Sequence, residues 1–314
     1  MPDLHCWIIT EGHAGMENQC LGLAQALGVT HEVYRIGPRA MWEFLPPRWW
    51  PAPLTRLDRP IKLPWPDLVI SCGRRSVAAA MAVRHAAGGR TRTIHIQEPP
   101  VPPARFDIIV IPEHDRLRAP NVLVTRGALH HVTPAKLAEA GTAFAPLFAH
   151  LPRPLISVMV GGSTRSQEFT PAIVTDLARK LAEAARTSGG SIALTPSRRT
   201  DARSIALLAE GLRGTPHYLW NREGDNPYFG LLALGDALVV TSDSVSMMTE
   251  ACITGKPVYL YEIPSGSRRL RRFREGLMTD GYARPFTGDL APWQPKTLNE
   301  TADVAAEIRR RLGF

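Results

Sequence analysis

Short runs of apolar residues alternate with amphipathic stretches along the whole chain of 314 residues. Such alternation predicts repeated strand–helix units built around mainly parallel sheets. The elements expected in the first half are strands at 4–10, 31–36, 67–71, 93–97, 107–111 and 122–125, and helices at 17–27, 76–87 and 134–150. Those expected in the second half are strands at 155–160, 191–195, 237–241 and 257–262, and helices after 170, after 226 and over 245–254.

The segment Leu151-Pro-Arg-Pro154 interrupts this pattern, and a new apolar strand follows it directly. We therefore predict two α/β domains, residues 1–150 and 151–314. An apolar stripe at helical spacing near the C-terminus predicts one more packing helix. The stripe consists of Ala302, Ala305, Ile308 and Leu312. This last helix could pack back on the first domain.

The net charge of +8, carried mostly by arginine, favours anionic partners such as phosphates or anionic lipid. Because no helix-turn-helix, RRM, KH or zinc-finger pattern accompanies the charge, we expect no nucleic-acid partner. The four cysteines are far apart and form no CxxC pair, which argues against a zinc site or a disulfide framework. The N-terminus lacks an export signal, and no apolar stretch approaches about 20 residues. We expect a cytoplasmic chain with, at most, peripheral contact on the inner face of the cytoplasmic membrane.

The segment Thr241–Glu250 follows an apolar strand and continues into a helix. A helix start offers free backbone N–H groups and the positive end of the helix dipole, which suit a phosphate. The hydroxyls of Ser242, Ser244 and Ser246 surround this start together with Asp243, and Glu250 lies on the same face as Ser246. We expect the serines to bind phosphate and Glu250 to accept the hydroxyls of a ribose. The alternative is an ordinary helix with a serine or aspartate cap.

Two further loops with many hydrogen-bond donors follow strands of the second half, and ligands bind at this edge of open α/β sheets. The candidates there are Gly161, Gly162, Ser163, Thr164, Arg165, Thr195, Ser197, Arg198 and Arg199. Asn221, beside Trp220, is a candidate for holding a nucleobase, although a surface turn explains it equally well. Glycine pairs also form simple turns, so the joint occurrence of the loops carries the prediction.

In the first half, the strand at 4–10 runs into a turn that contains His13 and Glu17. Either side chain could act as a general base on an acceptor hydroxyl. Glu98, held before a proline-rich loop, is a third candidate. The alternatives are an exposed histidine and a first-turn acid that complements the helix dipole. The turn Cys72–Ser76 carries two arginines, which suit an anionic acceptor or a solvated helix start.

Residues 38–66 combine tryptophan, arginine and proline, which suits a lipid headgroup layer. The alternative is an ordered excursion whose tryptophans fold back on the domain. A second basic run, residues 267–274, spaces Leu270 and Phe273 on one helical face among arginines. This run fits a solvent-exposed helix that buries one apolar side. The more specific alternative is a helix that contacts a pyrophosphate or lipid.

These motifs resemble the family named for plant elongated-mitochondria (mitochondrial fission) proteins, whose bacterial members are widely labelled nucleotide-sugar enzymes. The resemblance covers nearly the whole chain, and its matching stretches are 17–19, 160–162, 195–200, 226–228, 241–259 and 283–288. The C-terminal half is also similar to the GT-B transferase of peptidoglycan synthesis that adds N-acetylglucosamine. In that family a Gly-Gly-Ser loop and a Ser-rich helix start with a Glu hold the nucleotide-sugar, which matches Gly161–Ser163 and Ser244–Glu250. The loop Gly12–Gly15 is shorter than the glycine run of that family.

The resemblance implies a GT-B-like α/β fold, with two Rossmann-like domains whose mainly parallel sheets face a cleft. It also implies a metal-independent glycosyltransferase that uses a nucleotide diphosphate-sugar, UDP-linked, as substrate and needs no cofactor. No DxD pair stands at a suitable turn, which agrees with metal independence. The implied acceptor is a lipid-linked or envelope glycan, with an anionic membrane surface as a further partner. The alternatives are a nucleotide-sugar epimerase or hydrolase on the same fold, and a non-catalytic membrane adaptor.

Overall fold

The chain folds into two compact units, and the second begins at Val132 and ends at Leu298. The first unit takes the residues before it and the C-terminal segment from Asn299 to Phe314. The computed structural model describes residues 4–37, 45–46, 49–50, 52–61, 63–113, 115–164, 167–264 and 267–314.

Unit 1 contains a six-stranded parallel sheet in the order β2-β1-β3-β4-β5-β6. The strands are β1 (His5–Thr10), β2 (Thr30–Arg35), β3 (Leu68–Cys72), β4 (Arg92–Ile96), β5 (Ile108–Pro112) and β6 (Val122–Thr125). The helices are α1 (Ala14–Leu27), α2 (Ser76–Ala86), α9 (Thr301–Leu312) and the short 3-10 turns η3 (Pro53–Arg56) and η4 (Pro103–Arg105). Side chains of β1 alternate between two cores: Cys6 and Ile8 face the core of α1 and α9, whereas Trp7 and Ile9 face the core of α2. A parallel sheet covered on both faces requires such apolar strands.

Unit 2 contains a second six-stranded parallel sheet, in the order β12-β11-β10-β7-β8-β9. The strands are β7 (Leu155–Val160), β8 (Ser191–Pro196), β9 (His217–Leu219), β10 (Ala237–Thr241), β11 (Val258–Tyr261) and β12 (Arg284–Pro285). The helices are α3 (Pro134–Phe148), α4 (Pro171–Ser188), α5 (Ala202–Gly211), α6 (Tyr228–Leu234), α7 (Val245–Cys252) and α8 (Arg268–Thr279). Two cores cover the two faces of this sheet, one beneath α3, α6, α7 and α8 and one beneath α4 and α5.

The two units divide after His131, whereas the sequence analysis placed the boundary after residue 150. Helix α3 therefore lies in unit 2, where it packs against α6. Phe148 and Leu151 enter the core of unit 2, because the apolar stripe of α3 finds its partners there. The prolines at 152 and 154 mark the end of a helix that already belongs to the second unit.

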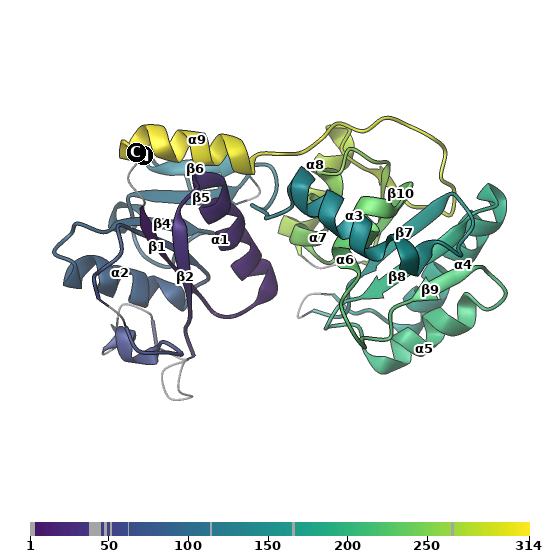
Figure 1. Ribbon diagram of the computed structural model, residues 1–314, viewed down its shortest axis with the longest axis horizontal. Coiled ribbons are helices and arrows are strands. Elements are labelled where there is room, and N and C mark those ends of the chain that lie inside the picture. The colour runs from purple at the N-terminus through teal and green to yellow at the C-terminus, as the bar shows by residue number, and fades with distance from the viewer. Residues whose placement is uncertain are drawn as a thin grey trace. The chain divides into compact units, whose positions relative to one another are not determined.

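Helix α9 packs against α1 in unit 1, although it follows the whole of unit 2 in the chain (Figure 1). Val304, Ala305 and Ile308 enter the core beneath α1. The Arg309 guanidinium donates to the carbonyl oxygen of Leu27 over 2.7 Å, at the C-terminal end of α1. The C-terminal helix thus completes the first unit.

The α/β class with two parallel-sheet units, predicted from the sequence, is confirmed. Besides the 3-10 turns η3 and η4, the elements that were not predicted are α5, β9 and β12. Strand β9 has three half-buried residues and no apolar run, and β12 pairs only over Arg284 and Pro285. Both are edge strands that depend on a neighbouring strand already in place. In the described part of the chain, no helix has the length and apolar character to cross a membrane.

Candidate functional site

The sheet of unit 2 has its topological switch point between β7 and β10. From β7 the chain continues to β8 on one side, and from β10 it continues to β11 on the other. The loops that follow β7 and β10 therefore start side by side at the carboxyl edge of the sheet and lead in opposite directions. Open α/β sheets bind ligands at this position. The predicted glycine loop follows β7, and the predicted serine segment follows β10.

Asp243 joins three loops at this switch point. Its carboxylate accepts from the backbone N–H of Gly162 (3.2 Å), from the Thr241 hydroxyl (2.7 Å) and from the Arg199 guanidinium (2.5 Å). The Asp243 side chain is fully buried, whereas that of Arg199 is 41% exposed. Burial raises the pKa of Asp243, and the contacts with Thr241, Arg199 and Gly162 oppose this rise. The buried carboxylate thus fixes a half-exposed guanidinium at the edge of the sheet.

Gly161 and Gly162 are required by the close approach of these loops. A Cβ atom at Gly161 would lie 1.9 Å from the carboxylate of Asp243, and one at Gly162 would lie 2.2 Å from the carbonyl oxygen of Arg199. The backbone N–H of Gly161 donates to the Thr241 hydroxyl over 2.7 Å. The glycine pair therefore has a structural reason that is independent of any ligand.

The loop after β8 is held against the glycine loop. The Thr200 hydroxyl donates to the carbonyl oxygen of Gly161 over 2.5 Å, and Ser197 accepts from the backbone N–H of Arg199 over 3.2 Å. Arg222 donates to the carbonyl oxygens of Ser197 (2.6 Å) and Thr200. Neither Thr200 nor Arg222 was predicted as a site residue. The positive φ of 73° at Arg222 is visible only in the structure.

The other predicted residues of this region have identifiable local roles. Arg198 is exposed, and the Thr195 hydroxyl donates to the Asn226 side chain over 3.1 Å. Asn221 is bonded within its own turn, to Glu223 over 2.8 Å, and is not brought to Asp243 by any contact in the described residues. Arg165 lies outside the described residues. Thr164 pairs with Gln167 through backbone hydrogen bonds, in the loop before α4.

The predicted serine hydroxyls of this region have in part a structural role. Ser244 caps α7 by accepting from the backbone N–H of Met247 over 3.4 Å, which is the capping role given as the alternative. Ser242 accepts from the backbone N–H of Ile263 over 3.0 Å, and Ser163 accepts from that of Phe169 over 3.0 Å. Ser246 lies half-buried in the first turn of α7. Three of these four hydroxyls therefore accept a backbone hydrogen bond.

Glu250 lies in the second turn of α7 and is only 4% exposed. Its carboxylate accepts a short hydrogen bond from the Tyr228 hydroxyl. Burial and the charge of Glu250 raise the pKa of Tyr228. Burial lowers the pKa of Lys136, an effect that the charge of Glu250 opposes, and the Lys136 ammonium lies 4.1 Å from the ring centroid of Phe229. Tyr228, Phe229 and Lys136 come from α6 and α3, so sequence spacing alone could not connect them with Glu250.

Unit 1 has a switch point of its own, between β1 and β3. Glu17 forms a bidentate ion pair with Arg35, over 2.9 and 2.7 Å, and is therefore not a free base in this conformation. His13 is exposed just before α1. Glu11, which the sequence analysis did not select, accepts from the backbone N–H of Arg75 over 3.0 Å.

Glu98 is exposed and follows Gln97, whose φ of 84° is unusual for a residue other than glycine. Backbone strain of this kind is concentrated at functional sites in proteins. His13 and Glu98 are thus the predicted bases of unit 1 with exposed side chains.

The tryptophan-rich segment is described only in part, because Trp42, Phe44, Arg39, Arg48 and Lys62 lie outside the described residues. Trp50 is buried and donates to the carbonyl oxygen of Leu45 over 3.1 Å, and Trp65 packs near Trp7. Trp49 is 61% exposed. Two of its described tryptophans therefore fold back on unit 1, as the alternative expected.

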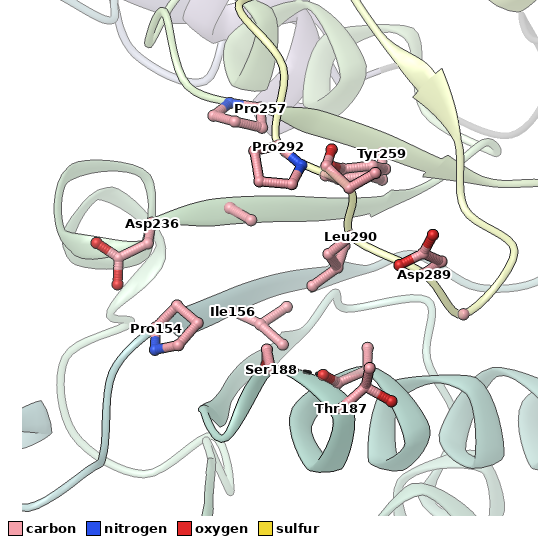
Figure 2. Close-up of a pocket in the computed structure, with 14 residues that line it drawn as sticks. Pro154, Ile156, Thr187, Ser188, Asp236, Pro257, Tyr259, Asp289, Leu290 and Pro292 are labelled. Carbon is pink, nitrogen blue, oxygen red and sulfur yellow. Dashed lines mark hydrogen bonds between the residues drawn. The ribbon is translucent and has the colours of Figure 1, made fainter.

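An apolar cavity of about 420 Å³ lies at the opposite, amino-terminal edge of the unit 2 sheet. Figure 2 shows Pro154, Ile156 and Tyr259 lining it with the segment from Asp289 to Pro292. The Tyr259 hydroxyl donates to the carbonyl oxygen of Ala291 over 2.7 Å and closes one side. None of the predicted site residues lines this cavity, so it is separate from the switch point.

Two units, each built on a six-stranded parallel sheet with its own switch point, define a GT-B-like α/β protein. The chain belongs to the family described as Mitochondrial fission ELM1, which matches residues 14–312, and the predicted family is thereby confirmed. The Mitochondrial fission protein ELM1 of Arabidopsis thaliana is 35% identical over an alignment of 274 residues. That alignment covers 79% of this chain and 64% of the plant protein, so the match spans less than two thirds of this relative.

Among solved structures, the UDP-GlcNAc 2-epimerase of Neisseria meningitidis, bound to UDP-GlcNAc, is similar with a TM-score of 0.58. It is 12% identical, and the match covers 98% of this chain and 100% of the epimerase. The UDP-GlcNAc 2-epimerase of Methanocaldococcus jannaschii gives a TM-score of 0.56 at 13% identity, over 97% of this chain and 92% of that chain. At this identity the likeness shows a shared fold.

Proposed function

We propose that unit 2 binds a UDP-linked sugar at its switch point and that the chain transfers the sugar to an acceptor without a metal ion. The observation that carries this proposal is the set of hydrogen bonds that Asp243 accepts from Gly162, Thr241 and Arg199. They fix the half-exposed Arg199 guanidinium beside the start of α7. A guanidinium and a helix N-terminus together stabilise a diphosphate. The charge that develops on the leaving diphosphate would be met by the same groups.

Glu250 is the proposed acceptor for the ribose hydroxyls. Its carboxylate is held in one orientation by Tyr228, which is the kind of support that a precise hydrogen-bonding site requires. His13 of unit 1 is the proposed general base, since Glu17 is engaged by Arg35. The acceptor proposed for this reaction is a lipid-linked or envelope glycan, used at the inner face of the cytoplasmic membrane.

A sugar epimerase is the second candidate, and the structural likeness to two UDP-GlcNAc 2-epimerases favours it. The two reactions differ in what they require besides the donor. An epimerase converts the nucleotide-sugar with no other substrate, whereas a transferase releases UDP only when an acceptor is present. Incubation with UDP-N-acetylglucosamine, followed by analysis of the nucleotide products, separates them.

The donor site is tested by calorimetric titration with UDP, ADP, GDP and CMP. We expect selective binding of UDP, weakened about tenfold or more in Glu250→Gln and in Arg199→Gln, because each change removes a charge-assisted hydrogen bond. Glu210→Gln and Arg213→Gln are the matched controls, since these two exposed residues form an ion pair at the C-terminal end of α5. Equal affinity in all five proteins, or no binding of UDP, would reject the site.

A further inference from the structure

Helix α8 (Arg268–Thr279) presents an arginine-rich face to solvent. Phe273 and Leu277 point into the core of unit 2, and Leu270 packs against it half-buried. Arg274 turns inward and forms an ion pair with Glu262 over 2.6 Å. The exposed residues of the helix are Arg268, Arg269, Arg271, Arg272, Glu275 and Thr279.

Arg268, Arg271 and Arg272 form one strip along this face, because residues three and four apart are neighbours on a helix. Within the described part of the chain, no carboxylate lies within ion-pair distance of these three guanidinium groups. Two exposed arginines of α4 differ in this respect. Arg179 pairs with Asp176, and Arg186 pairs with Glu183, each three residues earlier in its helix.

We propose that the exposed face of α8 docks on an anionic lipid bilayer. Clusters of four or more basic residues on an amphipathic helix bind anionic headgroups, and each residue near the surface strengthens the attachment. The exposed side chains of α8 include no aromatic or amide group that would stack on or read a nucleobase. A row of guanidinium groups without such readers fits a plane of headgroup phosphates better than a nucleic acid.

The contact is electrostatic and not insertional. The apolar side chains Phe273 and Leu277 are occupied by the core of unit 2, so α8 has no free apolar face to bury among acyl chains. Binding must therefore weaken strongly as salt is added, since ions screen exposed charges over a short distance. This separates α8 docking from an attachment that buries tryptophan side chains.

Co-sedimentation of the full chain with vesicles tests the proposal. Vesicles of phosphatidylcholine alone are compared with vesicles that also contain phosphatidylglycerol, at low and at high salt. We expect binding only to the anionic vesicles at low salt, reduced about 100-fold in the triple variant Arg268→Gln, Arg271→Gln, Arg272→Gln. The matched control is Arg179→Gln, Arg186→Gln, Arg213→Gln, which removes the same charge from paired arginines and should keep the wild-type affinity.

Three outcomes would overturn the proposal. Equal loss of binding in both triple variants would show attraction by net charge alone, and failure of the wild-type chain to bind anionic vesicles would exclude docking. Binding of an oligonucleotide that depends on the α8 arginines, with no vesicle binding, would assign the face to nucleic acid.

Calorimetry with UDP accompanies each variant. We expect the α8 triple variant to keep its affinity for UDP, and loss of that affinity would place these arginines in the donor site instead. Failure of UDP to bind any protein would affect the proposed function and leave the vesicle result standing.

Discussion

At the scale of single residues, the buried carboxylate of Asp243 positions the groups around it. Asp243 is buried, and its carboxylate accepts hydrogen bonds from two other loops, at Gly162 and Arg199, and from Thr241 at the end of β10. It therefore holds the loops of the switch point together. An unpaired carboxylate at this depth would be strongly destabilising. The Arg199 guanidinium and the Gly162 N–H compensate for its burial and are themselves positioned by it.

His95 in β4 is a second buried polar residue, and its titration gives a test of the core of unit 1. The ring is fully buried, stacks on Phe106 with centroids 4.9 Å apart, and has Nδ1 2.9 Å from the Ser71 hydroxyl. Burial lowers the pKa of His95 to about 3. In the unfolded chain an ordinary histidine binds a proton below about pH 6.5. Between these two values only the unfolded state is protonated, so stability falls as the pH falls.

We predict that protonation of this histidine in the unfolded chain lowers the free energy of unfolding. The loss is about 1.4 kcal/mol for each unit by which the pH falls between about pH 6 and pH 4. His95→Gln should reduce the slope of stability against pH by that amount, and urea unfolding at a series of pH values measures it. The same exchange at the exposed His150 is the control. A slope that changes equally in both variants would contradict the assignment.

At the scale of elements, the units depend on helices that are remote in sequence. Helix α9 supplies Val304, Ala305 and Ile308 to the core beneath α1, and Glu300, just before it, accepts from the backbone N–H groups of Arg126 (2.7 Å) and Gly127 (3.0 Å). The C-terminal segment is thus held by an apolar stripe and by backbone hydrogen bonds at its start.

Ile308→Ala should lower the free energy of unfolding of unit 1 by about 2–5 kcal/mol, because it leaves a cavity at a fully buried position of the core. Arg310→Ala on the exposed face of the same helix should change it by less than about 0.5 kcal/mol, since it removes only a solvent-exposed pair with Glu307. Urea unfolding of the two variants measures the difference. A small effect of Ile308→Ala would mean that α9 contributes little to the core.

For the whole molecule, each unit carries a parallel sheet with its own switch point, but the predicted donor loops belong to unit 2 alone. Hydrogen exchange can therefore locate the response to a ligand. UDP should slow amide exchange at residues 161–164, 196–200 and 242–250 and leave the core strands β1 and β3 of unit 1 unchanged, because binding stabilises the structure that it contacts. Protection confined to unit 1 would place the nucleotide in the other unit.

Much of the fold follows from local pattern. Strands β3, β7 and β10 are apolar runs bounded by turn residues, and helix α4 begins at a threonine cap followed by proline, so their positions are determined by short-range preferences. Because strand ends in a parallel sheet lie at one edge, the sequence alone also indicated that the glycine loop and the serine segment belong to one region.

The tertiary structure decided what these residues do there. It assigned α3 to unit 2 and α9 to unit 1, because each apolar stripe packs where its partners lie and not where the chain order suggests. It also joined Asp243 to Arg199, 44 residues earlier, and Glu250 to Tyr228, 22 residues earlier. Spacing along a chain specifies contacts only within one helix or strand, whereas these pairs form between loops and helices that packing brings together.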